Sequence, residues 1–213
     1  MSTFAFADLA GFTALTEAHG DETAADVAQR FAERVADVLP DGAELVKTIG
    51  DAVMLRFDDP SSAVRTGVLL SGGGLGDDAS PAVRVGMHTG SAVQRGADWF
   101  GEAVNIAARV TGQARGGETL LSDATKQQSA GLVDVVFDRL GPVDLRNVHT
   151  PVELWRARRV DTGRATPVID PVCRMAVDPS KAAGSLEHAG TSYTFCSLTC
   201  AALFATDPER YSA

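Results

Sequence analysis

Residues 6–13 read FADLAGFT, in which a short apolar strand ends at an acidic residue and a glycine leads into a helix. We expect the strand to span residues 3–7. The first backbone N–H groups of a helix have no partner within it, so the helix after Gly11 can bind phosphate oxygens while Asp8 holds a metal ion beside them. The alternative is that Asp8 only caps the helix.

A second acidic corner follows in residues 47–51, KTIGD. Residues 44–50 and 51–57 have the composition of two strands joined by a tight turn, so we expect a β-hairpin with Asp51 at the turn. From there Asp51 can join Asp8 on a pair of divalent ions, because hard cations take oxygen ligands and two carboxylates supply them. The alternative is that Asp51 simply occupies the turn, where Gly-Asp is common.

The third segment, residues 98–109, reads DWFGEAVNIAAR. Asn105 and Arg109 are four positions apart on a predicted helix, so they project from the same face and can reach one ligand. The apolar residues between them would anchor that helix to a sheet. The alternative is that Asn105 and Arg109 are simply exposed polar side chains that bind no ligand.

The remaining elements predict an α+β domain in which helices pack on a largely antiparallel sheet, in the order β-α-α-β-β-α-β-α-β. The glycine-rich residues 71–76 lack the Lys-Ser/Thr of a P-loop and are expected to be a flexible linker. Residues 161–167 show no apolar periodicity, so we place a linker there, between a domain of residues 1–160 and one of residues 168–213. Helices are expected over residues 22–39, 61–70 and 101–114, and the other strands over residues 83–89, 119–122, 133–137 and 152–157.

Charge and hydropathy restrict the classes of function. The formal net charge is −9, which argues against nucleic-acid binding because that binding relies on Lys and Arg. No stretch approaches the roughly 18 apolar residues needed to span a bilayer, and the N-terminus lacks the basic segment and apolar run of a secretion signal. We therefore expect a soluble, cytoplasmic protein with no membrane partner.

Taken in order, the segments FADLAGFT, KTIGD, VGMHTG and DWFGEAVNIAAR resemble the signature segments of the class III adenylyl/guanylyl cyclase catalytic domain. Residues 114–122 and 145–154 also look like that family, and the resemblance covers residues 3–158. It implies a ferredoxin-like catalytic domain with a mixed, largely antiparallel sheet. It also implies two Mg²⁺ or Mn²⁺ ions in each active site.

The resemblance assigns roles on the metal and phosphate side of the site. Asp8 and Asp51 match the two metal-binding aspartates, which makes them catalytic residues, and the backbone carbonyl of Leu9 matches a further metal contact. The backbone N–H groups of the following turn would receive the triphosphate; this turn consists of Gly11, Phe12 and Thr13.

The resemblance also assigns roles on the nucleotide side. Lys47 and Asp98 match the pair that reads adenine, since a donating ammonium suits N1 and an accepting carboxylate suits the N6 amine. Asn105 matches the residue that positions the ribose, and Arg109 matches the one that stabilises the transition state. Arg146 falls where the family usually has a triphosphate-binding Lys, so it keeps the charge but changes the donor geometry.

The function implied is adenylate cyclase: the ribose 3′-hydroxyl of ATP attacks the α-phosphorus, giving 3′,5′-cyclic AMP and pyrophosphate. In the family the site lies between two subunits, and this chain carries one complete set of residues, so a homodimer with two shared sites is expected. One alternative is a catalytically silent nucleotide-binding sensor or partner module. Another is a metal- or redox-responsive protein with cyclase output.

The C-terminal segment carries the chain's three cysteines. An odd count without a secretion signal does not indicate a disulfide framework. Residues 168–212 are similar to the YHS domain, with Arg174 where that family usually has Gly. Cys196 and Cys200 are four apart on a predicted helix, so with Cys173 they could form a three-thiolate site for zinc or copper.

The histidines are less informative. His188 is a candidate for the fourth ligand of the thiolate site. The alternative to a metal site is a reduced cysteine cluster without metal, or a redox-labile pair of cysteines. His88 is expected to be structural, and His19 and His149 are expected to be solvated.

Overall fold

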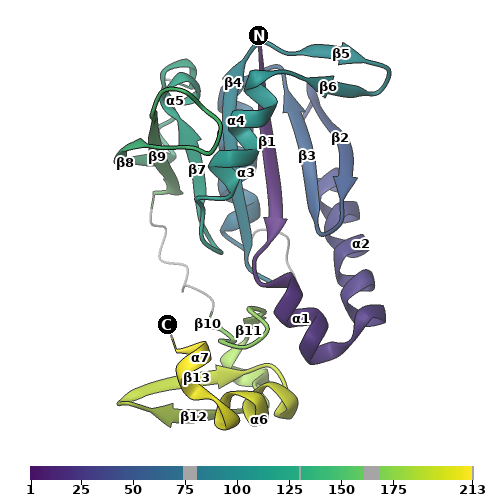
Figure 1. Ribbon diagram of the computed structural model, residues 1–213, viewed down its shortest axis with the longest axis vertical. Coiled ribbons are helices and arrows are strands. Elements are labelled where there is room, and N and C mark those ends of the chain that lie inside the picture. Colours follow the sequence, from purple (N-terminus) through teal and green to yellow (C-terminus); the bar gives the residue numbers. More distant parts are fainter. Residues whose placement is uncertain (74–80, 130, 161–167, 213) are drawn as a thin grey trace.

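The computed structural model describes residues 1–73, 81–129, 131–160 and 168–212. Its N-terminal domain is built on a seven-stranded sheet in the order β2-β3-β1-β4-β7-β9-β8 (Figure 1). Neighbouring strands are antiparallel except β4 and β7, which pair in parallel. The strands are β1 Ser2–Leu9, β2 Ala43–Ile49, β3 Ala52–Phe57, β4 Val83–Gly90, β7 Thr119–Ser122, β8 Val135–Val143 and β9 Val152–Arg159.

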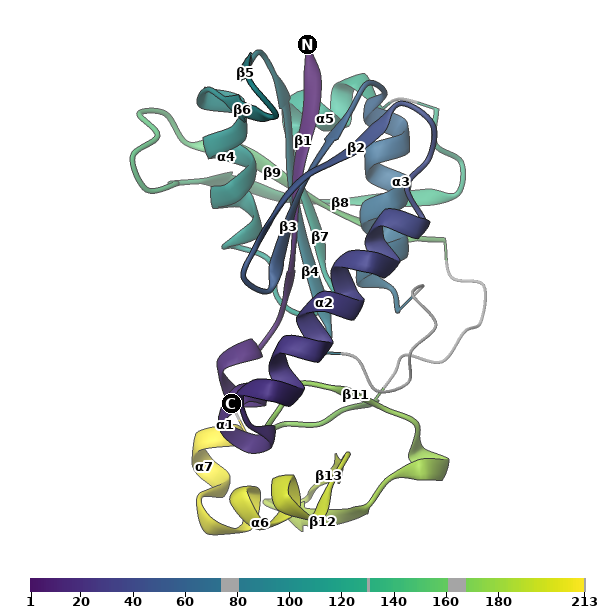
Figure 2. The ribbon, with the colours of Figure 1, turned by 90° about the vertical axis from the view of Figure 1, so that its right-hand side faces the viewer.

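Helices cover both faces of the sheet because β1 is apolar on both sides (Figure 2). Its odd-numbered residues from Ala5 to Leu9 join the core with α2 (Asp21–Asp37) and α3 (Pro60–Ser71). Its even-numbered residues Phe4 and Phe6 pack against the opposite helix. The helices that complete this domain are α1 Phe12–His19, α4 Glu102–Thr111 and α5 Asp123–Gln128.

Helix α4 lies very close to β4. A Cβ atom on Gly86 would come within 2.0 Å of the backbone nitrogen of Thr111, and Thr111 donates its hydroxyl to the carbonyl of Ala107 at 2.9 Å. Only glycine allows the helix to approach the strand so closely. Gly86 therefore allows the close packing that positions α4, the helix that carries Asn105 and Arg109.

A short hairpin of β5 (Val93–Arg95) and β6 (Asp98–Phe100) stands between β4 and α4 in the chain. The ring of Trp99 packs against Phe4, with 5.6 Å between centroids. The hairpin thus lies on the α4 side of the sheet and holds Asp98 there.

The C-terminal domain lies at the end of the sheet where α1 and the start of α2 are found (Figures 1 and 2). Its core stacks Phe204 against Tyr193 and Phe195, at 4.7 and 5.2 Å between centroids. The elements are β10 Val168–Ile169, β11 Ala176–Val177, a 3₁₀ turn Pro179–Lys181, β12 Gly184–His188, β13 Thr191–Phe195, α6 Leu198–Thr206 and α7 Pro208–Tyr211.

The predicted α+β architecture is confirmed, with differences at the ends of elements. Helix α4 is shorter than the predicted 101–114, and β8 is longer and later than the predicted 133–137. The β5–β6 hairpin and α5 were not predicted. The proposed linker at 161–167, and residues 74–76 of the glycine-rich stretch 71–76, lie outside the described residues, whereas Ser71 is the last residue of α3. In the described part of the chain, no helix has both the length and the hydropathy to cross a bilayer.

Candidate active site and thiol cluster

Asp8 lies at the end of β1 on the α4 side of the sheet, since it alternates with Phe4 and Phe6. It is paired in register with Ala52 on β3 and with Arg84 on β4. Arg84 donates its Nε to Asp8 Oδ2 at 2.7 Å and forms an ion pair with it. Helix α1 begins at Phe12 with Gly11 as its N-cap residue, and no side chain caps this helix, so the alternative in which Asp8 caps the helix is wrong.

Asp51 follows Gly50 in the tight turn between β2 and β3, where Gly50 has φ +61°. Burial and the neighbouring carboxylate of Asp8, to which it is hydrogen-bonded, raise the pKa of Asp51 to about 6. The two side chains therefore converge. A pair of carboxylates that repel each other in this way has the oxygen donors that Mg²⁺ or Mn²⁺ takes.

The turn after Asp8 has the geometry expected of an anion-binding helix start. Leu9 ends β1 and is buried, and Gly11 adopts φ +79°. The carbonyl of Gly11 accepts from Leu15 N–H at 3.0 Å, which leaves the N–H groups of the first turn, at Phe12 and Thr13, without partners inside the helix.

Lys47 and Asp98 meet in one subunit. Lys47 Nζ donates to Asp98 Oδ2 at 2.5 Å, and the backbone N–H of Trp99 donates to the other oxygen at 2.8 Å. The hydrogen bond from Lys47 lowers the pKa of Asp98. The pair thus presents a fixed donor beside a fixed acceptor.

The other predicted site residues stand apart from these pairs. Asn105 and Arg109 are exposed on α4, and Arg146 is exposed between β8 and β9. In the described part of the chain, none of these three side chains makes a hydrogen bond or an ion pair. The structure therefore joins Asp8 to Asp51 and Lys47 to Asp98, and leaves Asn105, Arg109 and Arg146 facing solvent.

Arg84 was missed in the sequence. It stands one strand away from Asp8 and 76 positions later, so only the β1–β4 register brings the two together. An Arg in a predicted strand next to the VGMHTG segment was the one available signal, and the spacing alone gave it no partner.

The three cysteines gather in the C-terminal domain as free thiols. Cys173 Sγ lies 3.4 Å from Cys196 Sγ, and Cys196 Sγ lies 3.8 Å from Cys200 Sγ. Hydrogen bonds from Cys173 and Cys196 lower the pKa of the Cys200 thiol. Cys196 precedes α6 instead of lying on it, so the prediction of both thiols on one helix is wrong, yet they still meet.

The histidine beside the thiols is His19, the last residue of α1. Its Nε2 lies 3.7 Å from Cys200 Sγ and 3.9 Å from Cys196 Sγ. The expectation that His19 is solvated is therefore wrong. His188 instead packs edge-on against Phe204. His88 bonds through Nδ1 to Ser122 Oγ at 2.7 Å, and burial lowers its pKa, as suits a structural residue.

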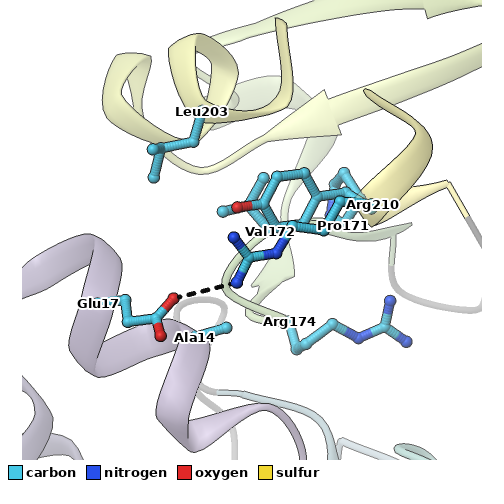
Figure 3. Close-up of a pocket in the computed structure, with 8 residues that line it drawn as sticks. Ala14, Glu17, Pro171, Val172, Arg174, Leu203 and Arg210 are labelled. Carbon is cyan, nitrogen blue, oxygen red and sulfur yellow. Dashed lines mark ion pairs between the residues drawn. The ribbon is translucent and has the colours of Figure 1, made fainter. Parts of the chain in front are cut away.

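The first turn of the C-terminal domain also touches the turn that starts α1. The side chain of Arg174 lies over Gly11, where a Cβ atom would be 2.2 Å from Arg174 Cγ. The carbonyl of Arg174 accepts from Ala82 N–H at 3.1 Å. Figure 3 shows Glu17 of α1 across a cleft of about 380 Å³ from Arg210, with which it pairs at 3.6 Å.

Comparisons with known proteins found relatives of both parts of the chain. Residues 168–213 match the YHS domain family. The pH-sensitive adenylate cyclase of Mycobacterium tuberculosis is 39% identical over 160 residues, which is 74% of this chain and 40% of that protein. The chain thus spans less than half of that relative's length.

Solved structures give the same result for the fold. The adenylyl cyclase CyaB from P. aeruginosa superposes with a TM-score of 0.64 at 21% identity, over 77% of this chain and 96% of that one. An adenylate/guanylate cyclase/hydrolase from Silicibacter pomeroyi superposes with a TM-score of 0.60 at 26% identity, over 75% of this chain and 97% of that one. The chain therefore combines a domain of the class III adenylyl/guanylyl cyclase catalytic fold with a C-terminal YHS domain.

Proposed function

We propose that this chain is an adenylate cyclase that converts ATP to 3′,5′-cyclic AMP and pyrophosphate, with residues 1–160 as the catalytic domain and residues 168–213 as an attached YHS domain. The observation that carries the proposal is the convergence of the Asp8 and Asp51 carboxylates beside the Gly11 turn. Several relatives are named adenylate cyclases, which favours ATP as the nucleotide. We place the reaction in the cytoplasm, where ATP is available and free thiols stay reduced.

Asp8 and Asp51, with the carbonyl of Leu9, would hold two Mg²⁺ or Mn²⁺ ions. Such ions, when bound, lower the pKa of the ribose 3′-hydroxyl and neutralise the triphosphate. The N–H groups at Gly11, Phe12 and Thr13 would bind phosphate oxygens at the start of α1. The 3′-hydroxyl would then lose its proton to water, and its oxygen would form a bond to the α-phosphorus as the bond to pyrophosphate breaks.

The Lys47–Asp98 pair supports a preference for adenine. Adenine offers an acceptor at N1 and a donor at N6, which match the ammonium and the carboxylate. Guanine reverses both, and each polar group left unpaired once a bound base covers it would cost about 1–3 kcal/mol. Two mismatches would favour ATP over GTP by roughly 10²- to 10⁴-fold, since about 1.4 kcal/mol corresponds to tenfold.

A homodimer would complete the site. Asn105 and Arg109 are exposed on α4 and have no side-chain partner in the described part of this chain. We infer that they act on the nucleotide held by the aspartates of a second subunit, where Arg109 would stabilise charge on the phosphorus and Arg146 would contact the triphosphate. Ile49 and Phe100 are 49% and 54% exposed on the α4 side, as residues of a dimer interface would be in a single chain.

The test is direct. Purified protein is incubated with ATP or GTP and with Mg²⁺ or Mn²⁺, and the cyclic nucleotide is quantified. We expect cyclic AMP from the wild type and none from Asp51→Ala. If the wild type binds ATP but forms no cyclic nucleotide with either metal, the proposal fails and the chain is a nucleotide-binding module.

A further inference from the structure

The thiol cluster of the YHS domain is completed by a residue of the catalytic domain. Donor atoms of His19, Cys173, Cys196 and Cys200 all lie within 4.8 Å of one another. Cys173 and Cys200 are fully buried, and His19 and Cys196 are half-buried. His19 lies more than 150 positions before the first cysteine, so only the docking of the two domains creates this set.

We propose that these four residues form a tetrahedral Zn²⁺ site that joins the YHS domain to helix α1 of the catalytic domain. The donor set is one of those that zinc takes in structural sites, three thiolates and one imidazole. With Zn–S near 2.3 Å and Zn–N near 2.0–2.1 Å, tetrahedral geometry places the ligand atoms about 3.5–3.8 Å apart.

The distances between the donor atoms match that geometry. Two of the three sulfur–sulfur distances are 3.4 and 3.8 Å, and two of the three nitrogen–sulfur distances are 3.7 and 3.9 Å. The two remaining pairs, Cys173 with Cys200 and Cys173 with His19, lie within 4.8 Å. A disulfide would need sulfurs at about 2.05 Å. Four donor atoms that all lie within 4.8 Å of one another can surround one ion.

The surroundings of the thiols hold the segments that carry them in place. The buried carboxylate of Asp170 accepts from the N–H groups of Val172 and Cys173 through one oxygen and from Cys196 N–H through the other, at 2.8, 3.3 and 2.8 Å. It thereby ties together the two segments that carry the cysteines. Cys200 lies in the first turn of α6, whose N-terminus favours a thiolate.

The position of His19 gives the site a role between domains. Helix α1 begins at Phe12, beside the turn that is proposed to bind triphosphate, and ends at His19. A metal bound to His19 would hold one end of this helix to the YHS domain, while Arg174 rests on Gly11 at the other end. The proposed site itself does not depend on cyclase activity, so the two proposals can fail separately.

The experiment uses the full-length protein, reduced and freed of metal, and titrated with Co²⁺ and then with Zn²⁺. Thiolate-bound Co²⁺ gives a charge-transfer band that carboxylate-bound Co²⁺ at Asp8 and Asp51 lacks, so the band reports this site alone. We expect one such Co²⁺ per chain, displaced by one Zn²⁺. His19→Ala and His19→Gln should lower the affinity at least about tenfold, whereas His188→Ala should leave it unchanged.

Hydrogen exchange tests the link between the domains. In the wild type, Zn²⁺ should slow exchange both in Phe12–His19 and around Cys173; in His19→Gln it should slow only the latter. A reduced wild type without the charge-transfer band would overturn the proposal. So would a His19→Gln protein with wild-type affinity, or a loss of affinity in His188→Ala instead.

Discussion

Asp8 and Arg84 form an ion pair directly across the β1–β4 register, with 2.7 Å between Arg84 Nε and Asp8 Oδ2. The same carboxylate repels Asp51, its neighbour on the other side. Arg84 thus lies against one side of Asp8, while burial and the nearby Asp8 carboxylate raise the pKa of Asp51 to about 6. Cations bound by both carboxylates would relieve the repulsion between Asp8 and Asp51.

Asp51→Asn should therefore stabilise the metal-free protein at pH 7 while it removes activity. The raised pKa of Asp51 means that its ionised carboxyl costs stability above about pH 6. This cost fades as the pH falls from about 6 to about 4, and it is gone below that range, where both folded and unfolded states carry the proton. After allowance for solvent screening of this half-exposed group, the gain is about 1 kcal/mol, or roughly 2–4 °C in Tm. Thermal unfolding at pH 7.5 and pH 4.5 with a chelator, with exposed Asp41→Asn as control, measures it; an equal gain at both pH values would contradict the electrostatic cause.

Lys47→Gln should weaken the preference for ATP. The substitution replaces the ammonium that faces Asp98 by a neutral amide, which can present either a donor or an acceptor to the base. The ratio of kcat/KM for ATP to that for GTP should therefore fall at least about tenfold. Lys126→Gln is the matched control, because the Lys126 ammonium lies over Trp155, far from Asp98 in the fold. An unchanged ratio in Lys47→Gln would show that other groups read the base.

Mixing two inactive variants should restore activity if the site is shared. Asp51→Ala removes one side of the site and Arg109→Ala the other, so a mixed dimer keeps one intact site. With random pairing, about half of the dimers are mixed, and each mixed dimer has one intact site of two. Activity measured after mixing the purified proteins should therefore recover to about one quarter of the wild-type level. Asp51→Ala mixed with Asp8→Ala lacks the same side twice and should stay inactive.

Phe100→Ser should weaken the dimer. The ring is 54% exposed at the end of β6, and the loss of its apolar burial costs up to about 1.5–3 kcal/mol of association. Light scattering across a dilution series would show the shift to monomer. Val133→Ser, next to the β8 edge at the other end of the sheet, removes an 89% exposed side chain and should leave the dimer intact.

Gly86→Ala should displace α4. The added methyl would meet the backbone of Thr111 at 2.0 Å, which a side-chain rotation cannot avoid. Overpacking of this kind costs about 1–3 kcal/mol, and the shift would also move Asn105 and Arg109. A lower Tm together with lower kcat is expected, whereas Gly184→Ala, which has no atom within 4 Å of the added methyl, should leave kcat and Tm near the wild-type values.

Local patterns were enough to predict most of the catalytic domain. The alternation around Asp8 and the Gly50 turn predicted the β1 strand and the β2–β3 hairpin, since both depend on residues close in sequence. The β5–β6 hairpin was missed because its strands have only three residues each. It is held by Trp99 against Phe4, a contact 95 positions away that no local periodicity reveals.

The partners of side chains were harder to predict than the elements that carry them. Lys47 and Asp98 were paired through the family resemblance, whereas Arg84 and His19 were missed. His19 is a polar residue at the end of a helix, which is ordinary at an exposed position. Only the docking of the YHS domain turns it toward three thiols.

The contact of Arg174 with Gly11 has a consequence for how such proteins diversify. A glycine at residue 11 serves the catalytic domain through its backbone conformation, and it also leaves the space that Arg174 fills. Gly11 should therefore be kept in all homologues, whereas Arg174 should be kept only where the two modules are fused and be free to change where they are encoded separately. If recombination replaced one module by a distant counterpart, the contact between residues 11 and 174 would be disrupted, while the core of each module would stay unchanged.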